Sequence, residues 1–232
     1  MSYTNLGYEV IDIPNLQEDL VRLRSHCFKV FNLISNKPVS NDKDLIQFRI
    51  NSQKNQFQAL KQLQFSPPLF KVAGNPFFAN FLISKHNFKI PNLELPPYLR
   101  CDIPIKEQSL FKQHQDYSYN NGSTNSVTIW IPLQDVNIDN GALLIASGTH
   151  KDGIYKNING TIDDSFEFAF EAIPVKFGQA IIFDQKIVHK SGFNSSDIVR
   201  FSILLRYSDL ADKDYLKRGF PLNHEIINKK FS

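Results

Sequence analysis

Cysteine is scarce in this sequence, with only Cys27 and Cys101 among 232 residues. Two cysteines cannot build a disulfide framework, and the residues around them do not have the spacing of a zinc ribbon. We therefore expect both to be small buried hydrophobic side chains, and we expect the protein to work in a reducing, cytoplasmic compartment.

Long apolar runs and a surplus of one charge are also missing. No run approaches the roughly 20 apolar residues that span a bilayer, and residues 1–17 are polar, without the apolar stretch of a secretory signal. The 26 lysines and arginines against 23 aspartates and glutamates form no basic block. These absences argue against a membrane partner and a nucleic-acid partner, and nothing in the sequence indicates an oligomeric state.

The sequence does contain enough apolar material for a substantial core, since hydrophobic residues make up 42% and aromatic residues 12%. Such a composition excludes disorder of the whole chain. The length favours a single domain over residues 1–232. Within it we expect a mainly helical part over 1–95, a β-rich core over 96–210 and a C-terminal tail over 211–232.

Helical periodicity dominates before residue 95. An apolar stripe at three-, four- and seven-residue steps predicts a first helix. The stripe comprises Leu16, Leu20, Cys27, Phe31 and Ile34. Asp42 is expected to cap a second helix that continues until Ser66-Pro67-Pro68. Its apolar positions are Leu45, Phe48, Phe57, Leu60 and Leu63. Asn75-Pro76 predicts the start of a short third helix.

After residue 95 the pattern changes to short apolar runs separated by turn residues such as Asn120-Asn121-Gly122. The runs that are typical of strands cover 98–103, 126–133, 142–146, 172–177, 180–183 and 199–207. Strands this short and regular, without a helix of useful length between them, predict an antiparallel sandwich such as a jelly roll. The predicted fold class is therefore mostly β with N-terminal helices, which we expect to cover the outer face of the sandwich.

Two of the six histidines begin a His-x-Asp triplet. In an extended segment residues i and i+2 lie on the same face, so an imidazole and a carboxylate can hold one metal ion. His150-Lys151-Asp152 lies between glycines in a predicted turn, where this rule does not apply. His114-Gln115-Asp116 instead ends an extended run and opens into a polar loop, where a scaffold usually presents a site.

A third ligand is expected from a late strand. His189 follows the apolar run 180–188, far enough beyond Asp116 for several strands to intervene before the chain returns. Two histidines and one carboxylate leave three open positions on an octahedral metal, which is the arrangement of non-haem Fe(II) oxygenases. Zinc also accepts two histidines and one aspartate, so the residues alone leave the metal open.

The run 199–207 carries an arginine that can hold an anion. Arg200, Ser202, Leu204 and Arg206 share one face of this predicted strand. An arginine that points into a sandwich is costly unless it meets an anion, and the planar fork of Arg200 suits a carboxylate. Ser202 can add a hydroxyl donor on the same face. A surface ion pair is the alternative interpretation of Arg200, and Arg206 is its competitor near the end of the strand.

Six segments occur in one order between residues 98 and 209. They are His114-Gln115-Asp116, Thr128-Ile129-Trp130-Ile131-Pro132-Leu133, Asn140-Gly141-Ala142-Leu143, Ser147-Gly148-Thr149-His150, His189-Lys190-Ser191 and Arg200. Their order and spacing resemble the phytanoyl-CoA dioxygenase family of Fe(II)/2-oxoglutarate-dependent oxygenases. The helical first third is similar to that family only in general character.

The resemblance implies a double-stranded β-helix (jelly roll, cupin-like) as the catalytic core over 96–210. It implies a dioxygenase that hydroxylates a small-molecule substrate with O2 and releases succinate and CO2. It also implies a set of site residues. Iron would be held by His114, Asp116 and His189, and the far carboxylate of 2-oxoglutarate by Arg200, whose spacing from His189 fits the family. The hydroxyl group of Ser191 would contact the cosubstrate. Gln115 and Trp130 would line the cosubstrate pocket, and a position in the hydrophobic core is the alternative for Trp130.

Two segments depart from the family pattern, which usually has Pro-Gly-Ser-His where residues 146–150 stand and often has Gly-Asp in place of Gly178-Gln179. Both are turn elements, so they affect loop detail and not the metal site. Related halogenases replace the metal carboxylate by a small residue, and because Asp116 is present we expect oxygenation. Two other functions stay open: a cupin-like metal-dependent enzyme that does not use 2-oxoglutarate, and a non-catalytic jelly-roll binding protein.

Overall fold

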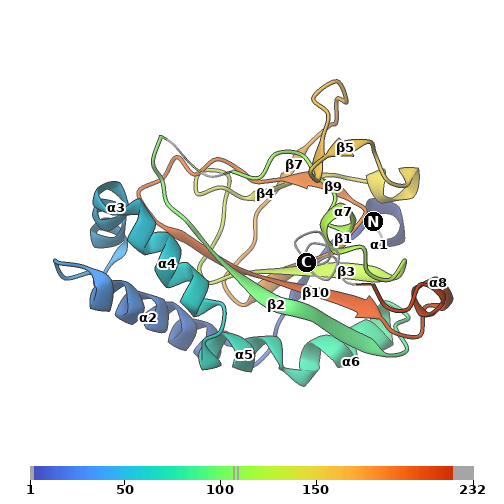
Figure 1. The fold of residues 1–232 in the computed structure, drawn as a ribbon, viewed down its shortest axis with the longest axis horizontal. Coiled ribbons are helices and arrows are strands. Elements are labelled where there is room, and N and C mark those ends of the chain that lie inside the picture. Colours follow the sequence, from blue (N-terminus) through green and yellow to red (C-terminus); the bar gives the residue numbers. More distant parts are fainter. Residues whose placement is uncertain (1–2, 107, 109, 222–232) are drawn as a thin grey trace, which may run out of the picture.

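The computed structural model describes residues 3–106, 108 and 110–221 (Figure 1). Its helices are α1 Tyr3–Leu6, α2 Gln17–Ile34, α3 Asp42–Asn51, α4 Gln53–Leu63, α5 Pro67–Ala73, α6 Pro76–Lys85, α7 Tyr117–Asn120 and α8 Lys213–Lys217, with a 3-10 turn, η1, at Thr149–Asp152. Its strands are β1 Tyr8–Asp12, β2 Pro91–Asp102, β3 Ser126–Pro132, β4 Leu143–Ala146, β5 Asn157–Ile158, β6 Thr161–Ile162, β7 Glu171–Ile173, β8 Gln179–Asp184, β9 Val188–Lys190 and β10 Arg200–Asp209. Of the expected tail over 211–232, residues 222–232 lie outside the described residues.

The strands form a sandwich of two antiparallel sheets. The larger sheet has the order β1-β8-β3-β10-β2, and the smaller one has the order β7-β4-β9, with a β5-β6 hairpin beside it. Figure 1 shows the smaller sheet above the larger one and α2, α5 and α6 below it. The predicted fold class, mostly β with N-terminal helices over a jelly-roll core, is confirmed.

Side chains alternate between two cores on the strands of the larger sheet. On β10, Phe201, Ile203 and Leu205 belong to the core shared with the helices, which also contains Phe31 of α2. Leu204 points the other way, into the core between the two sheets. Because both faces of the sheet are covered, its central strands read as continuous apolar runs.

The helical part differs from the prediction at its second helix. The expected single helix is broken at Ser52 into α3 and α4, and Ser52 has φ −153° and ψ 64°, outside helical geometry. The N-cap is Asn41, one residue before Asp42, and its side chain accepts a hydrogen bond from the amide of Asp44 at 3.0 Å. Phe57 is 53% exposed, because the buried side of α4 is formed by Gln56, Ala59 and Leu63 instead. The prediction of a helix beginning at Pro76 is confirmed, with Asn75 as its cap.

Several short strands were not predicted. β1 pairs with β8 at the edge of the larger sheet, and β9 pairs with β4 in the smaller one. Strands of two to five residues contain too few side chains for a period of two to be recognised in the sequence. β9 matters most for function, because it carries His189.

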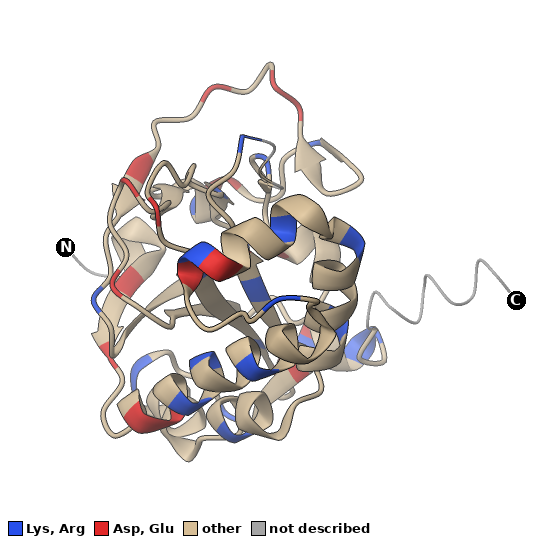
Figure 2. Cartoon of the chain, turned by 90° about the vertical axis from the view of Figure 1, so that its left-hand side faces the viewer, with Lys and Arg blue, Asp and Glu red and all other residues tan. Residues whose placement is uncertain are grey.

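The surface agrees with the balanced composition. Acidic and basic residues both occur among the helices that face the viewer in Figure 2. Within the described residues, no helix has both the length and the apolar character needed to cross a bilayer.

Candidate metal centre

Two histidines that lie far apart in the sequence face each other across a backbone pairing. The amide of His114 donates to the carbonyl of His189 at 3.0 Å, and the amide of His189 donates back at 3.0 Å. This antiparallel pairing brings the centres of the two imidazole rings to 4.1 Å. The rings are therefore positioned by backbone hydrogen bonds, and not only by the packing of their side chains.

Asp116 joins the two imidazoles from the segment that starts α7. Its Oδ1 lies 3.6 Å from Nε2 of His114 and 3.9 Å from Nε2 of His189. One ligand atom from each of the three residues lies within 4.8 Å of the others, and all three residues are buried. The structure thus brings together the three residues that the sequence predicts as metal ligands.

Neighbouring groups orient all three side chains. Nδ1 of His114 lies 2.7 Å from the carbonyl oxygen of Lys112, and Nδ1 of His189 lies 3.1 Å from that of Ile187. Each Nδ1–H can donate to its carbonyl, which leaves the lone pair of Nε2 for a metal ion.

The carboxylate of Asp116 is held from the other side. Its Oδ2 accepts a hydrogen bond from the hydroxyl of Thr128 at 2.6 Å and from Nε of Arg206 at 3.3 Å. Only Oδ1 is therefore left to face the two imidazoles, as a monodentate ligand requires.

The protonation states also suit a metal ion. Burial, reinforced by the neighbouring His114, lowers the pKa of His189 to about 3, so that its imidazole is neutral at pH 7. Burial by itself would raise the pKa of Asp116, but the charge of Arg206 and the contacts with the two histidines hold it well below its usual range. A neutral imidazole and an ionised carboxylate are the forms that bind metal.

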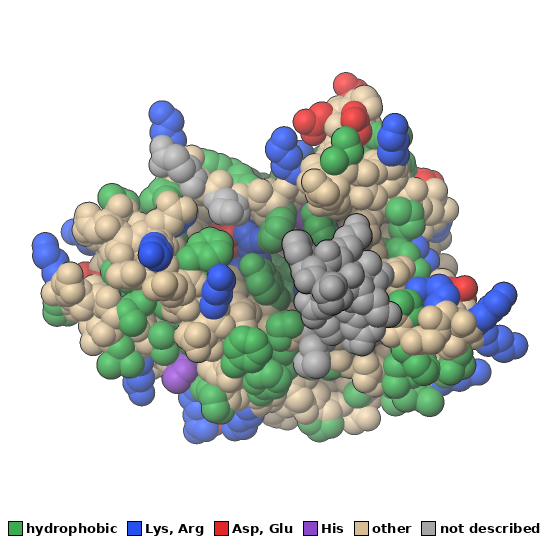
Figure 3. All heavy atoms as spheres, viewed as in Figure 1, with side chains coloured by type: hydrophobic (Ala, Val, Ile, Leu, Met, Phe, Trp, Pro, Cys, Tyr) green, Lys and Arg blue, Asp and Glu red, His purple; other side chains and the backbone are tan. Residues whose placement is uncertain are grey.

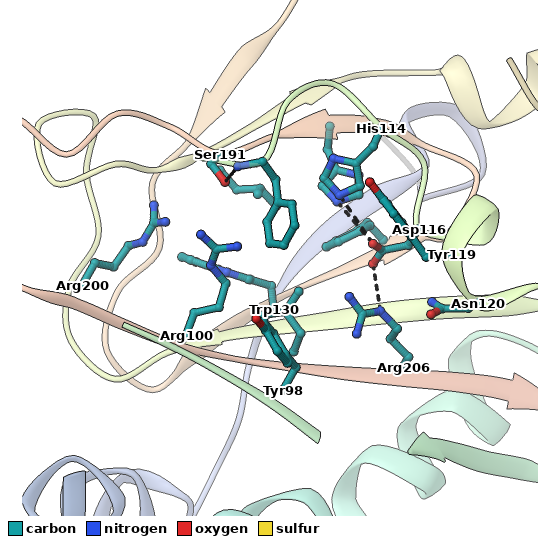
Figure 4. Close-up of a pocket in the computed structure, with 15 residues that line it drawn as sticks. Tyr98, Arg100, His114, Asp116, Tyr119, Asn120, Trp130, Ser191, Arg200 and Arg206 are labelled. Atoms are coloured by element: carbon teal, nitrogen blue, oxygen red, sulfur yellow. Dashed lines mark hydrogen bonds and ion pairs between the residues drawn. The ribbon is translucent and has the colours of Figure 1, made fainter. Parts of the chain in front are cut away.

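The three residues lie at one end of a cavity of about 320 Å³ between the sheets. Its walls consist of aromatic, apolar and arginine side chains. They are Tyr98, Arg100, Phe111, Tyr119, Asn120, Trp130, Leu143, Phe183, Ser191, Arg200, Leu204 and Arg206. Figure 3 shows the hollow on this face of the molecule with hydrophobic side chains around it, and Figure 4 shows the residues that line the cavity.

Arg200 lies at the other end of the cavity from the histidines (Figure 4). It is only 3% exposed, so the alternative of a surface ion pair is wrong. Its Nη2 lies 2.9 Å from Oδ2 of Asp102, which is also paired with Arg100. Burial alone would raise the pKa of Asp102, but the two arginines more than offset it and lower it to about 2.

Asp102 contacts the guanidinium of Arg200 at Nη2. Nε and Nη1 of Arg200 are buried and have no hydrogen-bond partner among the described residues. Buried donors without a partner are costly, and an anion that enters the cavity can accept a hydrogen bond there. The structure therefore supports the assignment of Arg200 as an anion ligand.

Of three other predicted site residues, two line the cavity and one does not. Ser191 and Trp130 line the cavity, and the ring of Trp130 lies 5.9 Å from the guanidinium carbon of Arg200. Ser202 is fully buried on the strand face of Arg200, and its Oγ has no partner among the described residues, but it is not one of the residues that line the cavity.

Gln115 requires a correction, because it does not line the cavity. Its side-chain amide donates to the carbonyls of Gly153 and Lys186 at 2.8 and 2.6 Å, and its Oε1 accepts from the amide of Tyr155 at 2.9 Å. The physical reason is the alternation that pairs His114 with Asp116, since the residue between them must point to the opposite side.

The sequence interpretation missed the residues that β2 contributes to the site. Tyr98 and Arg100 line the cavity, and Asp102 holds both arginines. They alternate along β2 with Leu99 and Cys101, which pack toward the helices. This alternation is a signal in the sequence, but identifying it requires knowing which side of the strand faces the cavity.

The second His-x-Asp triplet is not part of the site. His150 and Asp152 lie in η1, where the turn geometry expected for this segment is confirmed. The carboxylate of Asp152 accepts a hydrogen bond from the hydroxyl of Tyr155 at 2.6 Å.

Replacing Gly160 is expected to disturb the ring that stands over His114. Gly160 has φ +83°, and a Cβ there would collide with the ring of Tyr119, whose centre lies 5.6 Å from that of His114. Gly160→Ala should therefore reduce substrate turnover and lower thermal stability. Gly153 also has a positive φ, +82°, but no described atom lies within 4 Å of a Cβ at this position. Gly153→Ala should therefore lower the free energy of unfolding to a similar degree, by about 1–2 kcal/mol, without the loss of turnover. Equal turnover in the two variants would show that the ring position is unimportant.

Comparison with known proteins agrees with this geometry. Residues 103–202 match the family model described as phytanoyl-CoA dioxygenase (PhyH). A curated zebrafish (Danio rerio) protein, phytanoyl-CoA dioxygenase domain-containing protein 1, is 27% identical over 139 residues, which is 50% of this chain and 48% of that protein. Rice (Oryza sativa subsp. japonica) phytanoyl-CoA dioxygenase 1 is 26% identical over 135 residues, 50% of this chain and 48% of that protein. The chain thus aligns with about half the length of these relatives.

Solved structures share the fold at low sequence identity. The epimerase SnoN, in complex with Fe3+, alpha ketoglutarate and nogalamycin RO, superposes with a TM-score of 0.65 at 16% identity, covering 89% of this chain and 80% of that one. EctD from S. alaskensis, with 2-oxoglutarate and 5-hydroxyectoine, gives a TM-score of 0.61 at 18% identity, covering 90% and 74%. These likenesses confirm the jelly-roll fold. The matched segment and the curated relatives confirm the resemblance to the phytanoyl-CoA dioxygenase (PhyH) family over residues 103–202.

Proposed function

We propose that this chain is an Fe(II)- and 2-oxoglutarate-dependent oxygenase that hydroxylates an unactivated C–H bond of a small metabolite and releases succinate and CO2. One observation carries the proposal: a single cavity has two imidazoles and a carboxylate at one end and a buried guanidinium with unpaired donors at the other. Relatives of the same domain family are named dioxygenases, which supports the same activity.

The residues fit both groups that the activity requires. His114, Asp116 and His189 form the two-histidine, one-carboxylate set that non-haem iron takes, and their Nε2 and Oδ1 atoms are the ones left free. Arg200 fits the far carboxylate of 2-oxoglutarate, since it is a buried guanidinium whose Nε and Nη1 have no partner in the described part of the chain. When bound, iron and 2-oxoglutarate supply the oxidising chemistry, in which O2 is consumed and 2-oxoglutarate is converted to succinate and CO2.

The side chains of the protein position these groups and exclude water. Thr128 and Arg206 hold the carboxylate of Asp116 in one orientation. Arg200 fixes the far end of the cosubstrate, which determines how its other end meets the metal. Apolar walls such as Trp130 and Phe183 keep the reacting centre dry. A hydroxylation is the outcome that we propose; the structural neighbour SnoN is named an epimerase.

The test is turnover of 2-oxoglutarate without a primary substrate. Purified protein with Fe(II), 2-oxoglutarate and air should form succinate slowly, and omitting the iron or the O2 should stop it. Binding of 2-oxoglutarate is measured separately by calorimetry under nitrogen. Protein that retains metal but neither binds nor consumes 2-oxoglutarate would be a cupin-like enzyme of another kind. Protein that retains no metal would be a non-catalytic binding protein.

A further inference from the structure

A second arginine lies beside the metal ligands and has hydrogen-bond donors that no described residue accepts. Arg206 gives its Nε to Oδ2 of Asp116, and its side chain is 22% exposed toward the cavity that it lines. In the described part of the chain, its two Nη nitrogens have no hydrogen bond or ion pair. Figure 4 shows them turned away from Asp116, toward the middle of the cavity.

Burial raises the pKa of Glu94, although its carboxyl group is close enough for the charge of Arg206 to lower that pKa in part, and no hydrogen bond or ion pair joins the two side chains among the described residues. Glu94 stands opposite Arg206 in the β2–β10 pairing, but its Oε1 accepts from the hydroxyl of Ser208. Asp116 is the only acidic side chain among the described residues that line the cavity, and a metal ion would compete for its charge. The end of the cavity near the metal therefore keeps a positive charge with two free donors.

The cosubstrate anion is expected at the other end. Arg200 and Arg206 lie on the same face of β10, about 20 Å apart along the strand at 3.3 Å per residue, and Figure 4 shows them at opposite ends of the site. A 2-oxoglutarate that reaches from the metal to Arg200 leaves the Nη groups of Arg206 for a different anion.

The walls between these groups are apolar. Tyr98, Phe111 and Tyr119 are 39%, 42% and 37% exposed, so aromatic rings also stand where the cavity meets solvent. A ligand that suits this cavity has an apolar or aromatic body and one planar anion that can take two parallel hydrogen bonds, which describes a carboxylate.

We propose that the primary substrate is a small carboxylic acid whose carboxylate is bound by the Nη groups of Arg206 and whose apolar body lies against the aromatic walls. This assignment rests on the proposed function for the reaction that follows, but the binding itself does not require turnover. Arg206 would then be the specificity-determining residue, since it fixes the distance between the carboxylate and the carbon that is presented to the metal.

The experiment compares acids with their neutral primary amides. Hexanoate and hexanamide, and 3-phenylpropanoate and 3-phenylpropanamide, are titrated by calorimetry into protein loaded with Fe(II) and 2-oxoglutarate under nitrogen. We expect the acid of at least one pair to bind more tightly than its amide by about tenfold or more. In Arg206→Gln the affinities for acid and amide should differ by no more than about threefold. In Arg206→Lys most of the preference for the acid should remain.

Other results would overturn the assignment. It is wrong if neither acid binds better than its amide, or if the preference survives in Arg206→Gln. It is also wrong if Arg206→Gln weakens the binding of 2-oxoglutarate as much as the binding of the acids, because Arg206 would then bind the cosubstrate. Arg22→Gln, on the exposed face of α2, is the control for a change of net charge and should keep the full ratio. If this assignment is wrong, the wild-type protein should still form succinate in the absence of a primary substrate. Failure of the assignment is therefore distinguishable from failure of the proposed function.

Discussion

Asp116→Ala should abolish iron binding and succinate formation. The change removes one of three ligands and leaves Arg206 and Thr128 without their acceptor in a buried position. Residues that merely orient ligands typically contribute 10–100-fold to metal affinity, so loss of the ligand itself should exceed about a hundredfold. Iron is measured by metal analysis of desalted protein, and succinate by chromatography. The thermal unfolding midpoint is recorded for each variant, to separate loss of metal from loss of fold.

The chain supplies its own control for this experiment. Asp152 occupies the same place in the second His-x-Asp triplet, but it lies in η1 and accepts a hydrogen bond only from Tyr155 among the described residues. Asp152→Ala should therefore keep wild-type iron content and turnover. If the two aspartate variants retain iron equally, the cluster of His114, Asp116 and His189 is not the metal site.

The contrast between the two triplets also shows what could be predicted from the sequence. The choice of His114-Gln115-Asp116 depended on local structure, because only an extended segment places residues i and i+2 on one face. The same rule turns Gln115 away from the cavity, so the rule that found the ligands contradicts the role that the family resemblance implied for this residue.

Contacts between distant segments were harder to predict. The pairing of His114 with His189 depends on a three-residue strand, β9, which has too few residues to show a period. The register of β2 against β10 determines that Arg100 lies opposite Ser202 and that Asp102 lies opposite Arg200. Local propensity contains no information on register, because it is set by the packing of the whole sheet. This is why Arg200 could be recognised as an anion ligand while its partner Asp102 was missed.

The break between α3 and α4 has a similar origin. The apolar positions from Leu45 to Leu63 are compatible with one helix, but Ser52 interrupts it and Asn41 caps it one residue earlier than expected. Tertiary packing of this kind overrides local helical periodicity, since most of the stability of a helix in a protein comes from the burial of its apolar face. The error does not affect the site, since no residue of α3 or α4 is among those that line the cavity.

Arg200→Gln should raise the KM for 2-oxoglutarate by about a hundredfold. Glutamine keeps much of the side-chain volume but removes the charge, and buried hydrogen bonds to a charged group are worth roughly 1.5–3 kcal/mol, which corresponds to about tenfold to more than a hundredfold in affinity. Asp102 keeps its pair with Arg100, so the fold should survive the change. Calorimetric binding of 2-oxoglutarate and succinate formation at several concentrations give the two constants.

The iron content separates this effect from damage to the metal ligands. Arg200 lies at the far end of the cavity from His114, so Arg200→Gln should retain wild-type iron while it loses affinity for the cosubstrate. Arg200→Lys should recover only part of the affinity, because an ammonium group cannot form two parallel hydrogen bonds with one carboxylate. Arg22→Gln, whose guanidinium is paired on the surface with Glu18, should change neither quantity. An unchanged KM in Arg200→Gln would mean that the unpaired donors of this arginine serve a different anion, and the 2-oxoglutarate-dependent mechanism would lose its main structural support.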